Sequence, residues 1–366
     1  MTMQAEQEYR IGIVDTREAW EGMAGAWNAL LRSSRADTVF LSWEWLFSWA
    51  DSFLVAGRRL FIVTVHQGQE LIGVAPWYLN RVSRNLVNFD QLEFLGSPEA
   101  GSDYLDVILK EGREQEVTEQ LYQFLFRDGR MFWDCLLLRD IPSDSLFLLY
   151  LQDRIEREGK YAELSKGSYC PRVLLPKSAD WVPGISPKRR ARFRQDVGRL
   201  KKSGDVDHRT VTGEGLAEGL DDFFSFYEKK KGQGGSHLHR FLREFTRRSA
   251  GRDLVRIDFL ANRGVTIASL LHLRYNDELL LYLMVVDKEF NPKISSGNVL
   301  VGLCLEQAHA AGVSRYDLLK GNERYKFYWA DRGRSSLCLF MTQKKFNPLL
   351  YTAGRFMRYT AKILLR

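Results

Sequence analysis

The pattern of apolar residues in this chain of 366 residues predicts the same order of elements twice. Each half contains helical segments, two apolar runs joined by a short polar turn, a further strand, a loop, a helix and a last strand. In the first half the elements are expected at 41–53, 60–65, 71–79, 92–95, 104–109, 114–127 and 133–138. In the second half they are expected at 187–202, 219–231, 254–261, 266–275, 278–286, 299–311 and 315–320. The sequence therefore predicts a duplicated α/β unit, with chance similarity between short apolar strands as the alternative.

Composition excludes several other classes of protein. Hydrophobic residues make up 45% of the chain, which is too apolar for intrinsic disorder. Met1–Arg10 is polar, and the longest uninterrupted apolar run, Leu279–Val286, is far shorter than the roughly 20 residues of a membrane-spanning helix. Export and membrane insertion are therefore not expected, and the expected location is the cytoplasm.

The cysteines and histidines predict neither a disulfide framework nor a metal site. The four cysteines lie far apart, and two of them, Cys135 and Cys304, sit inside apolar runs and are expected to be buried thiols. His237 and His239 have a spacing that does not share one helix face, and no HExxH motif occurs. No metal is therefore expected.

Positive charge is concentrated in two segments. Lys188–Lys202 contains eight basic residues and one acid, and as a helix it presents a cationic surface suited to cofactor phosphates, nucleic acid or anionic lipid. A solvated face without a partner is the alternative. Lys344–Arg366 contains six basic residues, no acid and interleaved apolar residues. This basic amphipathic tail is suited to an anionic membrane surface, such as the inner membrane, or to docking on the protein itself.

The segment from 279 to 329 carries the candidate site. After an apolar run that ends at Val285 and Val286, a turn of small residues, Ser295-Ser296-Gly297-Asn298, leads into a helix. Such a helix N-terminus presents free backbone N–H groups to an anion. Polar side chains follow the last expected strand, the place where sites lie in α/β folds. The residues of interest there are Asp317, Glu323, Tyr325, Lys326 and Trp329.

These residues, together with segments of the first half, resemble the bacterial acetyltransferases of the GNAT superfamily that are grouped with cellulose and exopolysaccharide biosynthesis, relatives of the Fem-type peptidyltransferases. The resemblance covers nearly the whole chain, and the order of the motifs is more specific than any one of them. The matching segments are Phe40–Trp45 with Trp49, Gly101–Asp106, Lys188–Lys202, Ser295–Gly297, Asp317–Gly321, Glu323, Tyr325, Lys326 and Trp329.

The resemblance implies an α/β fold of two tandem GNAT-like domains, with mixed, mostly antiparallel sheets flanked by helices, at 1–160 and 161–345, followed by the tail at 346–366. It implies transfer of an acyl group, usually acetyl, from acyl-CoA as co-substrate to an amine or hydroxyl of a sugar or glycan intermediate in polysaccharide biosynthesis. The second domain is expected to keep the donor site. Two alternatives stay open: a Fem-type transferase that uses aminoacyl-tRNA, and a non-catalytic GNAT-like module of a polysaccharide-synthesis complex.

The resemblance also implies a donor site. Ser295, Ser296, Gly297 and Asn298 take the place of the acyl-CoA pyrophosphate loop, with one glycine remaining of the family's glycine pattern. Backbone N–H groups near Val285 and Val286 would polarise the thioester carbonyl.

In a transfer of this type the amine or hydroxyl attacks the thioester directly, and a general base takes its proton. Asp317 and Glu323 are the candidate bases, with His272 third. Structural ion pairs with Lys320, Arg324 or Lys326 are the alternative for the two carboxylates.

The remaining candidates serve the leaving group and the acceptor. Tyr325 or Tyr328 would protonate the leaving thiolate, and Lys326 would pair with a phosphate or hold the carboxylate. Core packing is the alternative for Tyr325 and for Trp329, which is expected to contact substrate. In the first half, Asp103, Tyr104 and Asp106 are expected to contact the acceptor, and Trp45 and Trp49 to stack on a sugar, again with core packing as the alternative.

Overall fold

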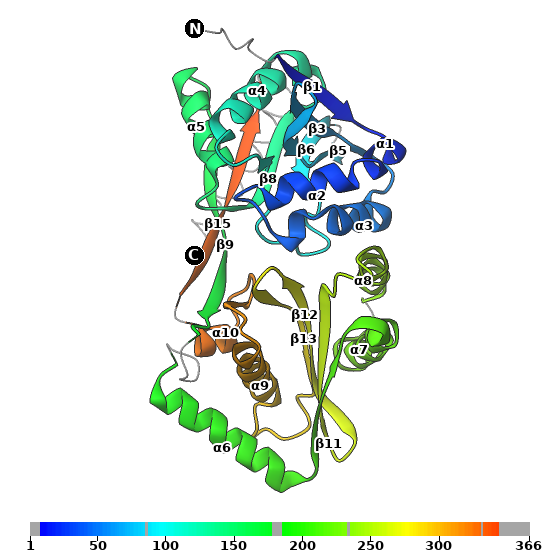
Figure 1. Ribbon diagram of the computed structural model, residues 1–366, viewed down its shortest axis with the longest axis vertical. Helices are drawn as coiled ribbons and strands as arrows, with labels where there is room; N and C mark the ends of the chain where they lie inside the picture. Colours follow the sequence, from blue (N-terminus) through cyan, green and yellow to red (C-terminus); the bar gives the residue numbers. More distant parts are fainter. Residues whose placement is uncertain (1–7, 85–86, 178–184, 233–234, 331, 344–366) are drawn as a thin grey trace. The chain divides into compact units, whose positions relative to one another are not determined.

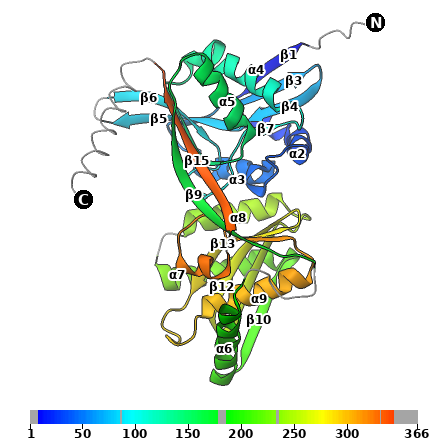
Figure 2. The same cartoon turned by 90° about the vertical axis from the view of Figure 1, so that its left-hand side faces the viewer.

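The computed structural model describes residues 8–84, 87–177, 185–232, 235–330 and 332–343. The chain forms two compact units (Figure 1, Figure 2), of which the first contains Met1–Gly167 and Ser336–Arg366 and the second contains Ser168–Ser335. The chain passes from one unit to the other within two strands, β9 (Glu163–Leu174) and β15 (Arg332–Thr342).

The unit boundaries differ from the expected ones. β15 pairs antiparallel with β8 (Cys135–Pro142), from Ser336 opposite Pro142 to Thr342 opposite Cys135. These backbone hydrogen bonds place the end of β15 in the first unit, whereas the sequence prediction assigned residues up to 345 to the second domain. The predicted tail at 346–366 lies outside the described residues. Among the described residues, no helix combines the length and the hydrophobicity needed to cross a lipid bilayer.

The first unit contains two sheets flanked by helices. One sheet has the order β1-β3-β4-β7, and the strands of the other that lie in this unit have the order β15-β8-β6-β5-β2. The strands are β1 (Tyr9–Val14), β2 (Arg58–Leu60), β3 (Ile62–Gln67), β4 (Glu70–Ala75), β5 (Trp77–Arg84), β6 (Val87–Phe94) and β7 (Ile108–Leu109). The helices are α1 (Arg17–Glu21), α2 (Ala24–Arg32), α3 (Trp43–Phe53), α4 (Glu114–Phe126) and α5 (Leu146–Arg157).

Most expected elements of the first half are present. α3 begins after Ser42, whose hydroxyl accepts a hydrogen bond from the backbone N–H of Trp45, as an N-cap does. The expected hairpin is formed by β3 and β4. The strand expected at 104–109 is reduced to β7, because Tyr104 has a φ of 55°, in the left-handed region that ends an extended segment.

The strands of the second unit have the order β10-β11-β12-β13-β14-β9. They are β10 (Val206–Val211), β11 (Val255–Asn262), β12 (Val265–Tyr275), β13 (Glu278–Val286) and β14 (Arg315–Asp317), with β9 next to β14. The helices are α6 (Pro187–Ser203), α7 (Leu216–Lys231), α8 (Ser236–Arg248), α9 (Ser296–Ala310) and α10 (Arg324–Trp329). Figure 1 shows α7 and α8 on one side of this sheet and α6 and α9 on the other. The core between α9 and the sheet is formed by apolar residues of both, which include Leu270, Leu279, Leu281, Val299, Leu300 and Leu305.

The two units repeat one topology. In the first, β6 and β8 pair in parallel at two positions, Gln91 with Cys135 and Leu92 with Leu136. In the second, β13 and β14 pair in parallel over three positions that begin at Glu278 and Arg315. Each parallel pair is joined through a helix, α4 or α9, as parallel strands require. The mixed α/β fold with duplicated units, predicted from the order of elements, is confirmed.

Candidate functional site

In the second unit, two parallel strands part beside a helix N-terminus. β13 pairs with β14 only over Glu278–Leu280 and then continues to Val286 with β12 as its partner. Next to the parting point, Tyr282 is an extra residue in β13, because Leu271 faces Leu283 and His272 faces Leu281. Such a bulge bends a strand and re-aims its backbone groups. Beyond it, one edge of β13 has no strand partner among the described residues and can hydrogen-bond to an extended ligand.

The expected donor turn lines a groove of about 410 Å³ at the start of α9. The N-cap residue, Ser295, makes no side-chain hydrogen bond to the helix, and no acid lies in the first turn. The first backbone N–H groups of a helix have no intrahelical partner and attract anions. Three cations also line this groove, and sequence reasoning did not place them there: Arg192 from α6, Lys288 and Lys293.

Gly297 allows α9 to begin close to β13. A Cβ at this position would lie 2.8 Å from Cγ2 of Val286 and 3.3 Å from Sδ of Met284. Val285 is fully buried, whereas Val286 and Met284 line the groove. The glycine therefore holds the anion-binding end of the helix against the part of β13 that has left β14.

Glu323 and Lys326 lie together after β14. Lys326 is 4% exposed and its Nζ donates to the carbonyl oxygens of Leu319, at 3.2 Å, and Lys320. The same Nζ lies 3.2 Å from Oε2 of Glu323, whose side chain is 57% exposed. Lys326 thus anchors the loop and forms with Glu323 the ion pair that is the structural alternative for this carboxylate, which stays accessible.

Tyr325 lines the groove together with the donor turn. Burial, with a smaller contribution from the charge of Glu323, raises the pKa of Tyr325 above its ordinary value. Its hydroxyl therefore keeps its proton at neutral pH.

Two predicted site residues are structural. Asp317 is fully buried. Its carboxylate accepts from Nε of Arg172 at 2.6 Å and from the backbone N–H of Leu319 at 2.8 Å. The ion-pair alternative is supported for Asp317, although its partner is Arg172 of β9. Trp329 is 2% exposed, and its Nε1 donates to Oδ1 of Asn298 at 3.1 Å. It packs in the core and positions the donor turn.

His272, the third candidate base, belongs to a buried polar network around Asp258. Nε2 of His272 lies 2.6 Å from the hydroxyl of Tyr316, and Nδ1 lies 3.1 Å from Oδ2 of Asp258. His272, Tyr316 and Asp258 are all fully buried. The structure therefore gives His272 no contact with the groove, because its ring nitrogens face protein groups under α9.

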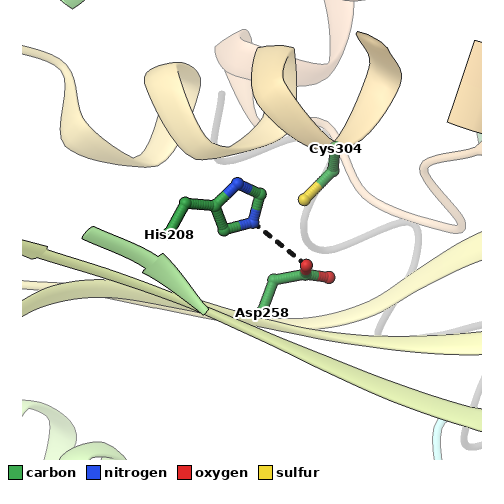
Figure 3. A group of neighbouring side chains, drawn as sticks. All are labelled: His208, Asp258 and Cys304. Atoms are coloured by element: carbon green, nitrogen blue, oxygen red, sulfur yellow. Dashed lines mark hydrogen bonds and ion pairs between the residues drawn. The ribbon is translucent and has the colours of Figure 1, made fainter. Parts of the chain in front are cut away.

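Asp258 also lies beside groups that resemble metal ligands. Figure 3 shows His208, Asp258 and Cys304 pointing toward one another between the sheet and α9, with ligand atoms within 4.8 Å. However, Arg256 donates to both carboxylate oxygens of Asp258, at 2.7 and 2.8 Å, and His208 lies 3.1 Å from Oδ1. A guanidinium already neutralises this carboxylate, and burial raises the pKa of the Cys304 thiol, which disfavours the thiolate a metal needs. The donor set is a poor fit for a cation.

Buried His272 makes the stability of the second unit depend on pH. Burial lowers the pKa of His272 in the folded chain below its ordinary value of 6.5. Below about pH 6.5 the unfolded chain binds a proton that the folded chain does not, so the free energy of unfolding falls as the pH drops. We expect His272→Gln to flatten this decline in urea unfolding between about pH 7 and pH 5, whereas the exposed His237→Gln control keeps the wild-type slope. An unchanged slope in His272→Gln would contradict this assignment.

The predicted acceptor residues of the first unit are packed in its interior. Asp103 and Tyr104 are 2% exposed and Asp106 is 5% exposed, while Trp45 and Trp49 are fully buried. Asp106 accepts from the hydroxyl of Ser145 at 2.9 Å, and the indole of Trp45 donates to Ser102 at 2.9 Å. Burial supports the alternative of core packing for these residues, because side chains enclosed in this way offer little surface to an acceptor.

The corresponding helix of the first unit is unsuited to an anion. α4 carries Glu114 and Glu116 in its first turn, which repel a phosphate, whereas α9 carries no acid there. A further groove in the second unit, of about 1070 Å³, lies at α7 and α8. It contains none of the predicted site residues, and its lining mixes arginines with acids. The start of α9 is therefore the best candidate for an anionic donor.

Comparisons with known proteins agree with this geometry. Residues 187–327 match the model of a family described as acetyltransferase (GNAT) domain. No curated protein sequence matches the chain. The fold is similar to that of FemX, with a TM-score of 0.61 and 10% identity over 90% of this chain and 98% of that one.

Two further solved structures have similar folds. L-PGS from Bacillus licheniformis has a TM-score of 0.56 and 13% identity, over 92% of this chain and 94% of that one. A conserved protein of unknown function from Bacteroides thetaiotaomicron has a TM-score of 0.56 and 11% identity, over 91% of this chain and 100% of that one. The chain therefore has a mixed α/β fold similar to that of these structures, and its residues 187–327 match the acetyltransferase (GNAT) domain model.

Proposed function

We propose that this protein is an acyltransferase that moves an acyl group, in the first instance acetyl, from acyl-CoA to an amine or hydroxyl of a sugar or glycan intermediate in polysaccharide biosynthesis. The observation that carries the proposal is the parting of β13 from β14 beside the acid-free N-terminus of α9. The open edge of β13 suits an extended amide chain, and the start of α9 suits a pyrophosphate. CoA contains both groups in one molecule.

The proposed reaction is a direct transfer. The acceptor nitrogen or oxygen attacks the thioester carbon, a C–N or C–O bond forms, and the C–S bond breaks. Glu323 takes the acceptor proton, and Tyr325 gives its proton to the leaving thiolate. A backbone N–H of β13 beyond the bulge polarises the carbonyl, and Lys326 holds Glu323 in place.

A second donor is supported by a specific observation. α6 exposes a row of cations, and FemX has a similar fold. The exposed cations are Lys188, Arg192, Arg194, Lys201 and Lys202. Such a helix can bind the phosphates of a charged tRNA, as a Fem-type transferase would.

Calorimetric titration separates these functions. We expect acetyl-CoA and CoA to bind the purified protein with micromolar affinity. Binding of charged tRNA in the absence of CoA binding would favour the Fem-type alternative. Binding of neither donor would reject both and leave the non-catalytic module. A panel of amino sugars and neutral sugars, with release of the CoA thiol as the readout, then identifies the acceptor class.

Glu323→Gln tests the proposed base. Because the amide cannot take a proton, we expect turnover to fall by about 100-fold or more while acetyl-CoA affinity is unchanged. The matched control is Glu289→Gln, which changes a carboxylate of the loop after β13 whose side chain is 92% exposed and which should leave turnover as it is. Wild-type turnover in Glu323→Gln would remove Glu323 as the base.

A further inference from the structure

Another groove, of about 380 Å³, lies between α6, α9 and β10. It is called the second groove below, and the groove at the start of α9 is called the donor groove. Its walls are mainly apolar, with Phe193, Val197, Leu200, Val206, Val299 and Leu303. His208 also lines it, and Asp258 holds the ring at Nε2, so the ring has a fixed orientation. A groove of this size with apolar walls and a few fixed polar groups is typical of a small-molecule site.

Two cations without partners flank this groove. Arg194 and Lys201 are exposed on α6, both line the groove, and in the described part of the chain neither forms a hydrogen bond or an ion pair. Seven residues of helix separate them by about 10 Å along the axis. The lining contains one acid, Glu306, so the balance of charge favours an anionic ligand with an apolar body.

The second groove adjoins the donor groove. In α6, Arg192 lines the donor groove and the next residue, Phe193, lines the second groove. In α9, Asn298 lines the donor groove and the next residue, Val299, lines the second groove. The helices are in close contact at this crossing, since a Cβ at Gly302 would lie 2.2 Å from the ring of Phe193. A ligand whose pyrophosphate is bound at the start of α9 can therefore extend along the crossing into the second groove.

We propose that this groove binds the nucleoside end of the donor, with the adenine against Phe193 and the apolar wall and the ribose 3′-phosphate at Arg194 and Lys201. The inference rests on the proposed use of acyl-CoA and adds the element that recognises its nucleotide. The volume suits one nucleoside, and a 3′-phosphate provides the anion that the two unpaired cations lack. It also assigns α6, which lies between β9 and β10 in the chain, a direct role in donor selection.

Titration of CoA and dephospho-CoA, which lacks only the 3′-phosphate, tests this subsite. We expect the wild-type protein to bind CoA about tenfold more tightly than dephospho-CoA, as charge-assisted hydrogen bonds allow. The double variant Arg194→Ala/Lys201→Ala should bind the two ligands equally, at the wild-type affinity for dephospho-CoA. The control is Lys202→Ala, which removes an exposed cation of the same helix outside the groove and should keep the tenfold preference.

A steric variant tests the apolar wall independently. Leu303→Trp narrows the groove, so it should weaken dephospho-CoA as well as CoA but leave S-acetylpantetheine, which has no nucleotide, unaffected. Equal wild-type binding of CoA and dephospho-CoA, or a preference that survives in the double variant, would overturn the subsite while leaving acyl-CoA as the donor. Absence of binding by CoA, dephospho-CoA and S-acetylpantetheine alike would overturn the proposed donor and the subsite with it.

Discussion

Asp258→Ala is expected to lower the free energy of unfolding of the second unit by about 3–5 kcal/mol. The carboxylate is fully buried and receives hydrogen bonds from Arg256, from His208 and, at 2.8 Å, from Thr210. Burial alone would raise the pKa of Asp258, but these partners and His272 hold it well below its ordinary value. Removing the carboxylate leaves the Arg256 guanidinium partly buried and without its counter-ion, and this uncompensated charge is the main cost.

Urea unfolding followed by circular dichroism measures this effect. The matched control is Asp222→Ala, which breaks an ion pair between Asp222 and Arg209 whose side chains are 47% and 52% exposed. An exposed pair contributes less than about 1 kcal/mol, so this variant should unfold close to the wild-type midpoint. Because Asp258 is deprotonated in the fold and its pKa is lowered, its contribution is present above the unfolded pKa of about 3.9 and is lost as the pH falls further. Equal destabilisation by both variants would contradict the central role of Asp258.

Gly297→Val is expected to weaken acetyl-CoA binding by about tenfold or more. The new side chain would overlap Val286 and Met284, so the first turn of α9 must move away from β13. The helix N-terminus and the strand edge, which are the two parts of the proposed donor site, are then displaced relative to each other. Calorimetry with acetyl-CoA measures the loss, and circular dichroism reports whether the variant is folded.

Gly198→Ala is the control for this substitution. Gly198 lies in α6, and a Cβ there meets no atom within 4 Å, so acetyl-CoA affinity should not change. Wild-type affinity in a folded Gly297→Val protein would show that the donor does not use the start of α9. The outcome also tests the predicted donor loop, because Gly297 is the one glycine that remains there of the pattern of the family that the chain resembles.

Local patterns predicted the elements that bury an apolar face. α3, α4, α9 and the three antiparallel strands β11, β12 and β13 lie close to their predicted positions, because each contains a long run or a helical period of apolar residues. The donor turn was predictable for the same reason, since a small-residue turn before an apolar helix is a local signal. Glu323 and Lys326 were recognisable as a pair because they are three residues apart.

Features that depend on distant pairing were not predictable. β9 contains no continuous apolar run, and that of β15 is confined to Leu337–Met341. Both strands pair with partners far away in the chain. Asp317 resembled a catalytic carboxylate because its partner, Arg172, is 145 residues away. No local pattern marked Asp258, whose partner His208 is 50 residues away on another strand. A single sequence does not reveal which charges meet when strands assemble.

The path of the chain through β9 and β15 has a consequence for the order in which the protein is completed during synthesis. The second unit, Ser168–Ser335, is one continuous segment, inserted between two parts of the first. β8 obtains its antiparallel neighbour only when residues from Ser336 onward leave the ribosome. The half that is translated first is therefore finished last, against the usual N-to-C order of domain folding. Until then the edge of β8 is open, and a nascent chain arrested before Ser336 carries a complete second unit attached to an incomplete first one.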